Sequence, residues 1–182
     1  MKRILSILTL AFISVFAFSQ NIPAGVRMEI VEIEQDDNEF SIFTYKDEGG
    51  TPAYYLSLCR NTDILGLISD SSETSFGIFS ETCLLMGETA EEALAFLDSL
   101  LELCDEAVGT NAEFAGRKTF GGEKLGEPTT ATAVVTKRFL QSKRLCFYFT
   151  SGKRSSEADL KKSTIKMLRM NLKLDRKLHP SD

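Results

Sequence analysis

The stretch that decides the fold is residues 89–109, TAEEALAFLDSLLELCDEAVG. Thr89 can accept a hydrogen bond from the amide of Glu92 while the Glu92 side chain reaches back to Thr89, which is the capping box that begins many helices. Gly109 can adopt the left-handed conformation that ends a helix. Apolar residues recur between them at spacings of three and four: Ala90, Ala93, Leu94, Leu97, Leu100, Leu101, Cys104 and Ala107. Acidic residues fall largely opposite, so we expect one helix face to be buried.

Strand-like sequence on both sides of this helix predicts a sheet that its apolar face can cover. Runs rich in β-branched and aromatic residues alternate with turn residues. The expected strands are residues 26–33, 40–45, 53–59, 64–68 and 75–86 before the helix, and 131–139 and 145–150 after it. We therefore predict a single α+β domain: an antiparallel meander, a helix, a second hairpin and a C-terminal helix. Both helices are expected to pack on one face of a curved sheet.

In the first two expected strands the apolar alternation slips by one residue, after Ile30 and after Ile42. Such a slip indicates either a β-bulge or a strand with both faces covered. The sequence leaves both interpretations open for each strand.

Residues 110–130 contain four glycines and Pro128 and show no sustained periodicity. We interpret them as a long ordered loop, with at most a short strand near residues 117–120. Long loops on rigid scaffolds often carry binding residues. This loop and an exposed face of the sheet are therefore candidate binding surfaces.

The first 19 residues have the features of an export signal. Lys2 and Arg3 precede an apolar run over residues 4–18, and Ala17 and Ser19 are the small residues that a signal peptidase recognises. About 15 apolar residues are fewer than the roughly 20 of a membrane-spanning helix. No cysteine precedes Cys59, so the lipid-bearing cysteine of a lipoprotein is lacking. We expect residues 1–19 to be cleaved and residues 20–182 to form one soluble domain, periplasmic or secreted.

Charge is distributed unevenly along the chain. Residues 20–136 contain 6 basic and 22 acidic residues, a balance of −16, whereas residues 137–182 contain 13 basic and 4 acidic residues, a balance of +9. The basic end can fold back on the acidic body, which is the arrangement we favour. Alternatively, a basic face is kept for an acidic partner or an anionic membrane surface.

The cysteine and histidine content limits the possible chemistry. Four cysteines (Cys59, Cys83, Cys104 and Cys146) allow three disulfide pairings in an exported chain, but each lies in an apolar stretch where a buried thiol is equally expected. The chain has no CxxC motif and one histidine, which argues against a Cys/His zinc site. That histidine, His179, lies at the end of the last helix, a poor position for acid–base catalysis. We expect no catalytic histidine, no metal and no cofactor.

Carboxylates are the remaining catalytic candidates. Five acidic residues gather around the first turn: Glu32, Glu34, Asp36, Asp37 and Glu39. They could form a catalytic pair or hold calcium, although their spacing matches no calcium-binding loop. Acidic residues on one face of a strand and in its turn are usually solvated, and we favour that interpretation.

Residues 151–156, SGKRSS, are expected to join a strand to the last helix, with Ser156 as the N-cap. Exposed amides beside Lys153 and Arg154 could hold an anion there. The segment is only a fragment of a phosphate-binding loop, because Phe147 stands where the motif requires a glycine. An ordinary helix start is therefore the favoured interpretation.

The last helix combines a broad apolar side with a basic side. The apolar side contains Leu160, Thr164, Ile165, Met167, Leu168, Met170, Leu172, Leu174 and Leu178. The cations include Lys162, Lys166, Arg169 and Lys173, which with Lys153 and Arg154 are the candidate binding residues. The pattern fits a core helix with a solvated basic face, which we favour, and also an interfacial helix on anionic lipid.

These observations favour an exported, non-enzymatic binding module that recognises a macromolecule of the cell envelope or the exterior. One alternative is a carboxylate-based extracytoplasmic hydrolase that uses Glu32, Glu34 and Asp36. Another is a peripheral membrane protein attached through the basic amphipathic C-terminal helix. The acidic total and the lack of aromatic residues among the cations argue against nucleic acid as a partner.

Overall fold

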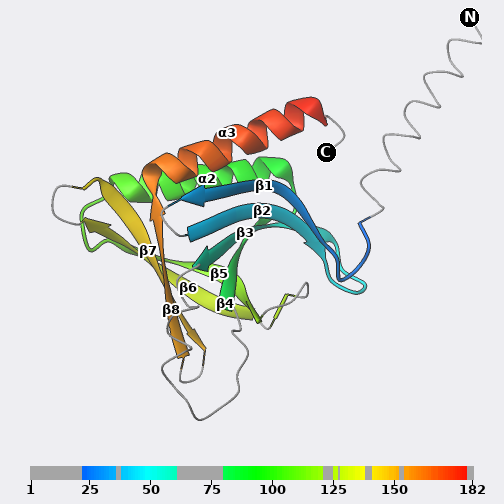
Figure 1. The fold of residues 1–182 in the computed structure, drawn as a ribbon, viewed down its shortest axis with the longest axis horizontal. Helices are drawn as coiled ribbons and strands as arrows, with labels where there is room; N and C mark the ends of the chain where they lie inside the picture. Colours follow the sequence, from blue (N-terminus) through cyan, green and yellow to red (C-terminus); the bar gives the residue numbers. More distant parts are fainter. Residues whose placement is uncertain are drawn as a thin grey trace, which may run out of the picture.

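A computed structural model describes residues 22–35, 38–60, 80–120, 125–126, 128–137, 141–151 and 154–179. Eight strands form one antiparallel sheet in sequence order, and two helices lie side by side along one face of the curved sheet (Figure 1). The strands are β1 (Arg27–Gln35), β2 (Asn38–Lys46), β3 (Pro52–Arg60), β4 (Ser80–Gly87), β5 (Asn111–Phe120), β6 (Pro128–Lys137), β7 (Lys143–Ser151) and β8 (Arg154–Lys161); the helices are α2 (Ala90–Asp105) and α3 (Lys162–Leu178). The predicted α+β fold with both helices on one sheet face is confirmed.

Among the described residues, the element order is four strands and a helix, followed by four more strands and a second helix. β1 to β4 lead into α2, and β5 to β8 lead into α3. Within the described residues the sheet stays open, with β1 and β8 at its two edges. The expected strand at residues 64–68 and the start of the one at 75–86 lie outside the described residues.

The prediction of a loop over residues 110–130 was wrong, because much of this segment is strand β5. It pairs with β4 on one side and with β6 on the other. Gly116, which suggested a loop, faces β4 so closely that a Cβ there would lie 3.0 Å from the carbonyl oxygen of Cys83. Because glycine has no Cβ, β4 and β5 can approach each other closely at this position. Strand β5 is held by its pairing with β4 and β6, although its sequence lacks the alternation of apolar residues that is typical of a strand.

The prediction that Ser156 caps the last helix was also wrong. Residues 154–161 form β8, which pairs with β7 from Ser151↔Arg154 to Arg144↔Lys161. Ala158 and Leu160 point into the main core with the two-residue period of a strand. The helix begins at Lys162, and its N-cap residue Lys161 makes no side-chain capping bond.

The slip in the apolar alternation has a different cause in each of the first two strands: a bulge in β1 and two buried faces in β2. In β1 the register shifts between Glu29 and Val31, which is a bulge. In β2 the pairing with β3 is continuous and both faces are buried. Phe40 and Ile42 join the main core, whereas Phe43 joins a second cluster on the opposite sheet face.

The main core lies between the helices and the sheet. Its fully buried members include Leu97 and Leu100 of α2 and Ile165 and Leu168 of α3. The second cluster, on the other sheet face, contains Phe43, Tyr45, Ala53, Tyr55, Cys83 and Leu125. Burial of each large apolar side chain contributes about 1.5–3 kcal/mol. The sheet face opposite the helices therefore has its own buried cluster over β2, β3 and β4.

Helix α2 begins as the sequence predicts and ends earlier. The Thr89 hydroxyl accepts from the amide of Glu92 at 3.2 Å, and the Glu92 carboxylate accepts from the amide of Thr89 at 3.2 Å, so the capping box is confirmed. The last helical residue is Asp105. Gly109 has the expected positive φ of 95°, but it lies in the turn that leads to β5, where its amide donates to the carbonyl of Val135 at 2.8 Å.

The cysteines whose side chains are described are free thiols. Cys83, Cys104 and Cys146 are all buried, in agreement with the buried-thiol interpretation. Burial raises the pKa of the Cys104 thiol to about 11, so this thiol is protonated at neutral pH. The side chain of Cys59 lies outside the described residues.

Candidate binding surface

Helix α3 is docked by one face. Thr164, Ile165, Leu168 and Leu172 are buried against the sheet and α2. Their spacing of one, three and four residues places them on one side of a helix with 3.6 residues per turn. The rest of the helix surface divides into an ion-paired sector, a lysine row and an apolar strip.

The ion-paired sector faces α2. Arg169 holds Asp98 through two contacts, Nε to Oδ1 at 2.5 Å and Nη2 to Oδ2 at 2.9 Å. Lys162 pairs with Asp105, and Arg176 pairs with Glu91. Successive partners are seven residues apart on each helix and run in opposite directions, so the pairs form a ladder along two antiparallel helices.

The ladder accounts for much of the charge polarity in the sequence. Hydrogen bonding to Arg169 lowers the pKa of the Asp98 carboxyl, and hydrogen bonding to Lys162 lowers that of Asp105. Lys143 adds a cation at the end of α2, where its Nζ donates to the carbonyl oxygens of Asp105 and Glu106. The basic C-terminal part thus folds back on the acidic helix, as the favoured interpretation predicts.

The lysine row consists of Lys166, Lys173 and Lys177. All three side chains are exposed. Within the part of the chain that the structure describes, none of them forms an ion pair. On a helical wheel they lie next to the ladder, on its solvent side. These are therefore the cations of α3 that remain available to another molecule.

The apolar strip consists of Met167, Met170, Leu174 and Leu178. Met170 is 62% exposed, Leu174 54% and Leu178 67%. On the wheel they lie beyond the lysine row, on the side away from α2. Strand β1 packs against α3 and runs along this side of it. Exposed apolar side chains in such a contiguous strip are typical of an interaction site.

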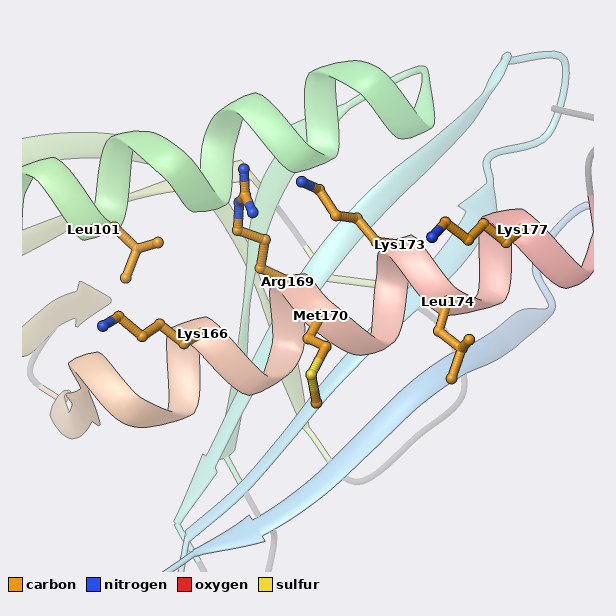
Figure 2. A pocket seen from close by; sticks show the side chains of 7 residues that line it. All are labelled: Leu101, Lys166, Arg169, Met170, Lys173, Leu174 and Lys177. Carbon is orange, nitrogen blue, oxygen red and sulfur yellow. The ribbon is translucent and has the colours of Figure 1, made fainter.

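A shallow groove of about 640 Å³ follows these two features along α3. It is lined by Leu101, Lys166, Arg169, Met170, Lys173, Leu174 and Lys177 (Figure 2). In Figure 2 Arg169 and Lys173 point toward α2, whereas Met170 and Leu174 point to the opposite side. We call the lysine row and the apolar strip together the α3 outer surface.

The structure separates the six basic residues that the sequence marked as candidates. Lys166 and Lys173 belong to the α3 outer surface. Lys162 and Arg169 are engaged with acidic residues of α2. Lys153 lies outside the described residues, and so does the side chain of Arg154, whose backbone is in β8. Because β8 replaces the expected helix start, the proposed anion site at residues 151–156 loses its helix N-terminus.

The exposed apolar strip differs from the expectation. Met167, Met170, Leu174 and Leu178 belong to the side of α3 that was expected to be buried. The signal was the breadth of that side, since one sheet face and one neighbouring helix cannot cover a sector that extends over so much of a helix. Lys177 was not among the candidate binding residues predicted from the sequence.

The acidic residues proposed for a hydrolase lie on an edge strand. Glu32 and Glu34 are exposed on β1, opposite Ser41 and Glu39 of β2. Asp36 and Asp37 lie outside the described residues. A pair of catalytic carboxylates usually lies in a site that is shielded from bulk water. The exposed positions of Glu32 and Glu34 are instead typical of a solvated strand face.

Other features of the described residues add no chemical centre. His179 is exposed at the C-terminus of α3, with its Nε2 3.8 Å from the Asp175 carboxylate. No group of three or more histidine, cysteine or acidic residues among them is placed to hold a metal ion. None of the helices in the described ranges is long and apolar enough to cross a membrane.

Comparisons with protein-family models, with curated proteins and with solved structures found no match to this chain. Its function must therefore be argued from its own residues, and the α3 outer surface is the feature with the clearest functional content.

Proposed function

We propose that this chain is an exported, non-enzymatic binding module and that the α3 outer surface is where it binds an anionic partner. One observation carries the proposal: a docked helix leaves Met170, Leu174 and Leu178 exposed beside three exposed lysines that form no salt bridge among the described residues. Leaving large apolar side chains in water contributes nothing to folding, so their clustering beside available cations favours a binding role.

Export is part of the proposal and rests on the sequence of residues 1–19. We expect cleavage before Gln20, which leaves β1 and the rest of the described fold intact. N-terminal sequencing of the chain recovered after expression in a bacterial host tests this. A recovered chain that still begins with Met1 would contradict it.

The binding proposal is tested with the processed chain, residues 20–182, labelled with ¹⁵N. Three anionic probes are added in turn: polyglutamate, vesicles of phosphatidylcholine and phosphatidylglycerol, and an acidic amphipathic peptide. At least one probe should perturb the amide resonances of α3, and added salt should weaken the effect.

Charge reversal provides the matched control. Lys173→Glu should weaken binding about tenfold, whereas Lys137→Glu, an equal charge change at the exposed end of β6, should leave it almost unchanged. The proposal fails if all three probes leave the α3 resonances unperturbed, or if both variants weaken binding equally.

A further inference from the structure

We infer that the α3 outer surface receives an acidic amphipathic helix of another protein. This inference rests on the proposed function and specifies the partner of the same site. The alternatives are an anionic lipid surface and a second copy of this chain, and the charges on the neighbouring helix separate the three.

The spacing of the apolar strip matches a helical partner. Met167, Met170, Leu174 and Leu178 follow one another at three and four residues, so they form a straight row about 16 Å long at 1.5 Å per residue. A second helix lying along this row would place its own apolar residues between them, as in other helix-in-groove complexes. Strand β1 packs against α3 on the side away from α2.

The lysine row defines the charge of that partner. Lys166, Lys173 and Lys177 border the apolar strip on one flank only, at spacings of seven and four residues. A helix in the groove would therefore carry glutamate or aspartate at matching intervals along one flank of its apolar face. The lysines also determine which flank of the partner helix lies next to α2. Its acidic flank should lie along the lysine row, and its other flank should lie toward the sheet edge.

A flat anionic surface fits less well. Helix α2 lies beside α3, and its solvent-facing side exposes Glu92, Glu102 and Glu106. A planar membrane that contacted the lysine row would also meet these carboxylates, and like charges would repel. A rod as narrow as a helix can lie in the groove along α3 without covering the solvent-facing side of α2.

A second copy also fits less well. The solvent-facing side of α2 has only Ala95 and Ser99 between its glutamates, so it offers no large apolar side chain to Met170 or Leu174. Antiparallel pairing of α3 with α3 of another copy, around a twofold axis that crosses the helices, would bring the two lysine rows together. The partner is therefore a different chain with the chemistry described above.

The test measures binding of a fluorescently labelled 18-residue peptide that has leucine at positions spaced three and four apart and glutamate along one flank. Fluorescence anisotropy with the processed chain should give a micromolar Kd. The same peptide with lysine in place of glutamate should bind at least tenfold more weakly. Equal binding of the two peptides would overturn the inference.

Two pairs of variants locate the site. Lys173→Glu and Met170→Ser should each raise Kd about tenfold or more. Their controls are Lys137→Glu and Val108→Ser, since Val108 is 58% exposed and so resembles Met170 in exposure. The controls should leave Kd within about twofold, and all four variants should retain the circular dichroism spectrum of the parent. Site variants that bind like their controls would overturn the inference.

Two further measurements distinguish this inference from the broader proposal. Sedimentation with phosphatidylglycerol-containing vesicles should leave the protein in solution, and light scattering should show a monomer. Vesicle binding without peptide binding would overturn the helix as partner while leaving an anionic-ligand module in place. A dimer that Met170→Ser dissociates would identify a second copy as the occupant and overturn the inference. No binding to peptide, vesicles or polyglutamate would remove both proposals.

Discussion

Helices α2 and α3 occupy equivalent places, each after four strands and each on the same sheet face, yet they use their surfaces differently. In α2 the residues at spacings of three and four, Ala90, Ala93, Leu97, Leu100 and Cys104, are all buried. In α3 four residues are buried and a second apolar row faces water. An apolar pattern wider than the available contact therefore leaves apolar side chains exposed, and in α3 they lie beside three lysines that form no salt bridge within the described part of the chain.

The largest expected effect separates the two apolar rows of α3. Leu168→Ala, at a fully buried position, should lower the free energy of unfolding by about 2–5 kcal/mol, because it removes packed methyl groups and leaves a cavity. Leu174→Ala, at a position 54% exposed, should lower it by less than about 1 kcal/mol. Urea denaturation measures both. Equal losses would mean that Leu174 is packed, and the α3 outer surface would not exist as described.

The second prediction concerns how the two helices begin. Thr89→Ala should lower the free energy of unfolding by about 1 kcal/mol, because it removes the hydroxyl that accepts from the Glu92 amide. Thr89→Ser keeps that hydroxyl and should stay within a few tenths of a kcal/mol of the parent. Helix α3 has no such cap to lose. An alanine variant as stable as the serine variant would show that the capping box contributes nothing.

The third prediction concerns the ladder that joins the helices. A double-mutant cycle of Asp98→Asn and Arg169→Gln should give a coupling of about 0.5–1 kcal/mol, because the pair makes two close contacts but is partly exposed. The coupling should decrease in high salt. A coupling of zero at low salt would mean that the charges only accompany apolar docking.

The fourth prediction concerns the pH dependence of stability. Because two carboxyl pKa values are lowered in the folded chain, stability should fall as the pH becomes acidic. The pKa values of Asp98 and Asp105 lie below their ordinary value of 3.8 in the folded chain. Their contribution to stability is therefore present above about pH 4 and is lost as the pH falls below it. Asp98→Asn should flatten the fall in unfolding free energy over this range, and an unchanged acid limb would contradict the assignment.

Much of the fold followed from local signals. The Thr89 capping box and the three-and-four spacing predicted α2, and alternating aromatic and β-branched residues predicted β2, β3, β6 and β7. Strand β5 was not predicted, because it is stabilised by pairing with two neighbouring strands rather than signalled by an alternating apolar sequence, and because Gly116 suggested a loop. Strand β8 was not predicted, because Ser156 and Asp159 resemble the start of a helix. Pairing with β7 instead determines the extended conformation of these residues.

The candidate site was only half predictable. The cations of α3 could be read from the sequence, but the ladder depends on which acidic residues of α2 lie opposite, a tertiary fact. Lys162 and Arg169 form ion pairs in that ladder, whereas Lys166 and Lys173 line the groove with Leu101 and border the apolar strip. A helical wheel shows which residues share a side, but it does not show how much of that side the sheet covers.

The most direct test of the account is amide hydrogen exchange across residues 162–178 in the processed chain, without lipid or partner. The account predicts that α3 exchanges about as slowly as α2, because its inner face is packed although its outer row is exposed. Exchange near the unfolded rate in α3, with α2 still protected, would contradict it. In that case the apolar side of α3 would not be packed against the sheet in the free protein, and the α3 outer surface would not be a preformed site.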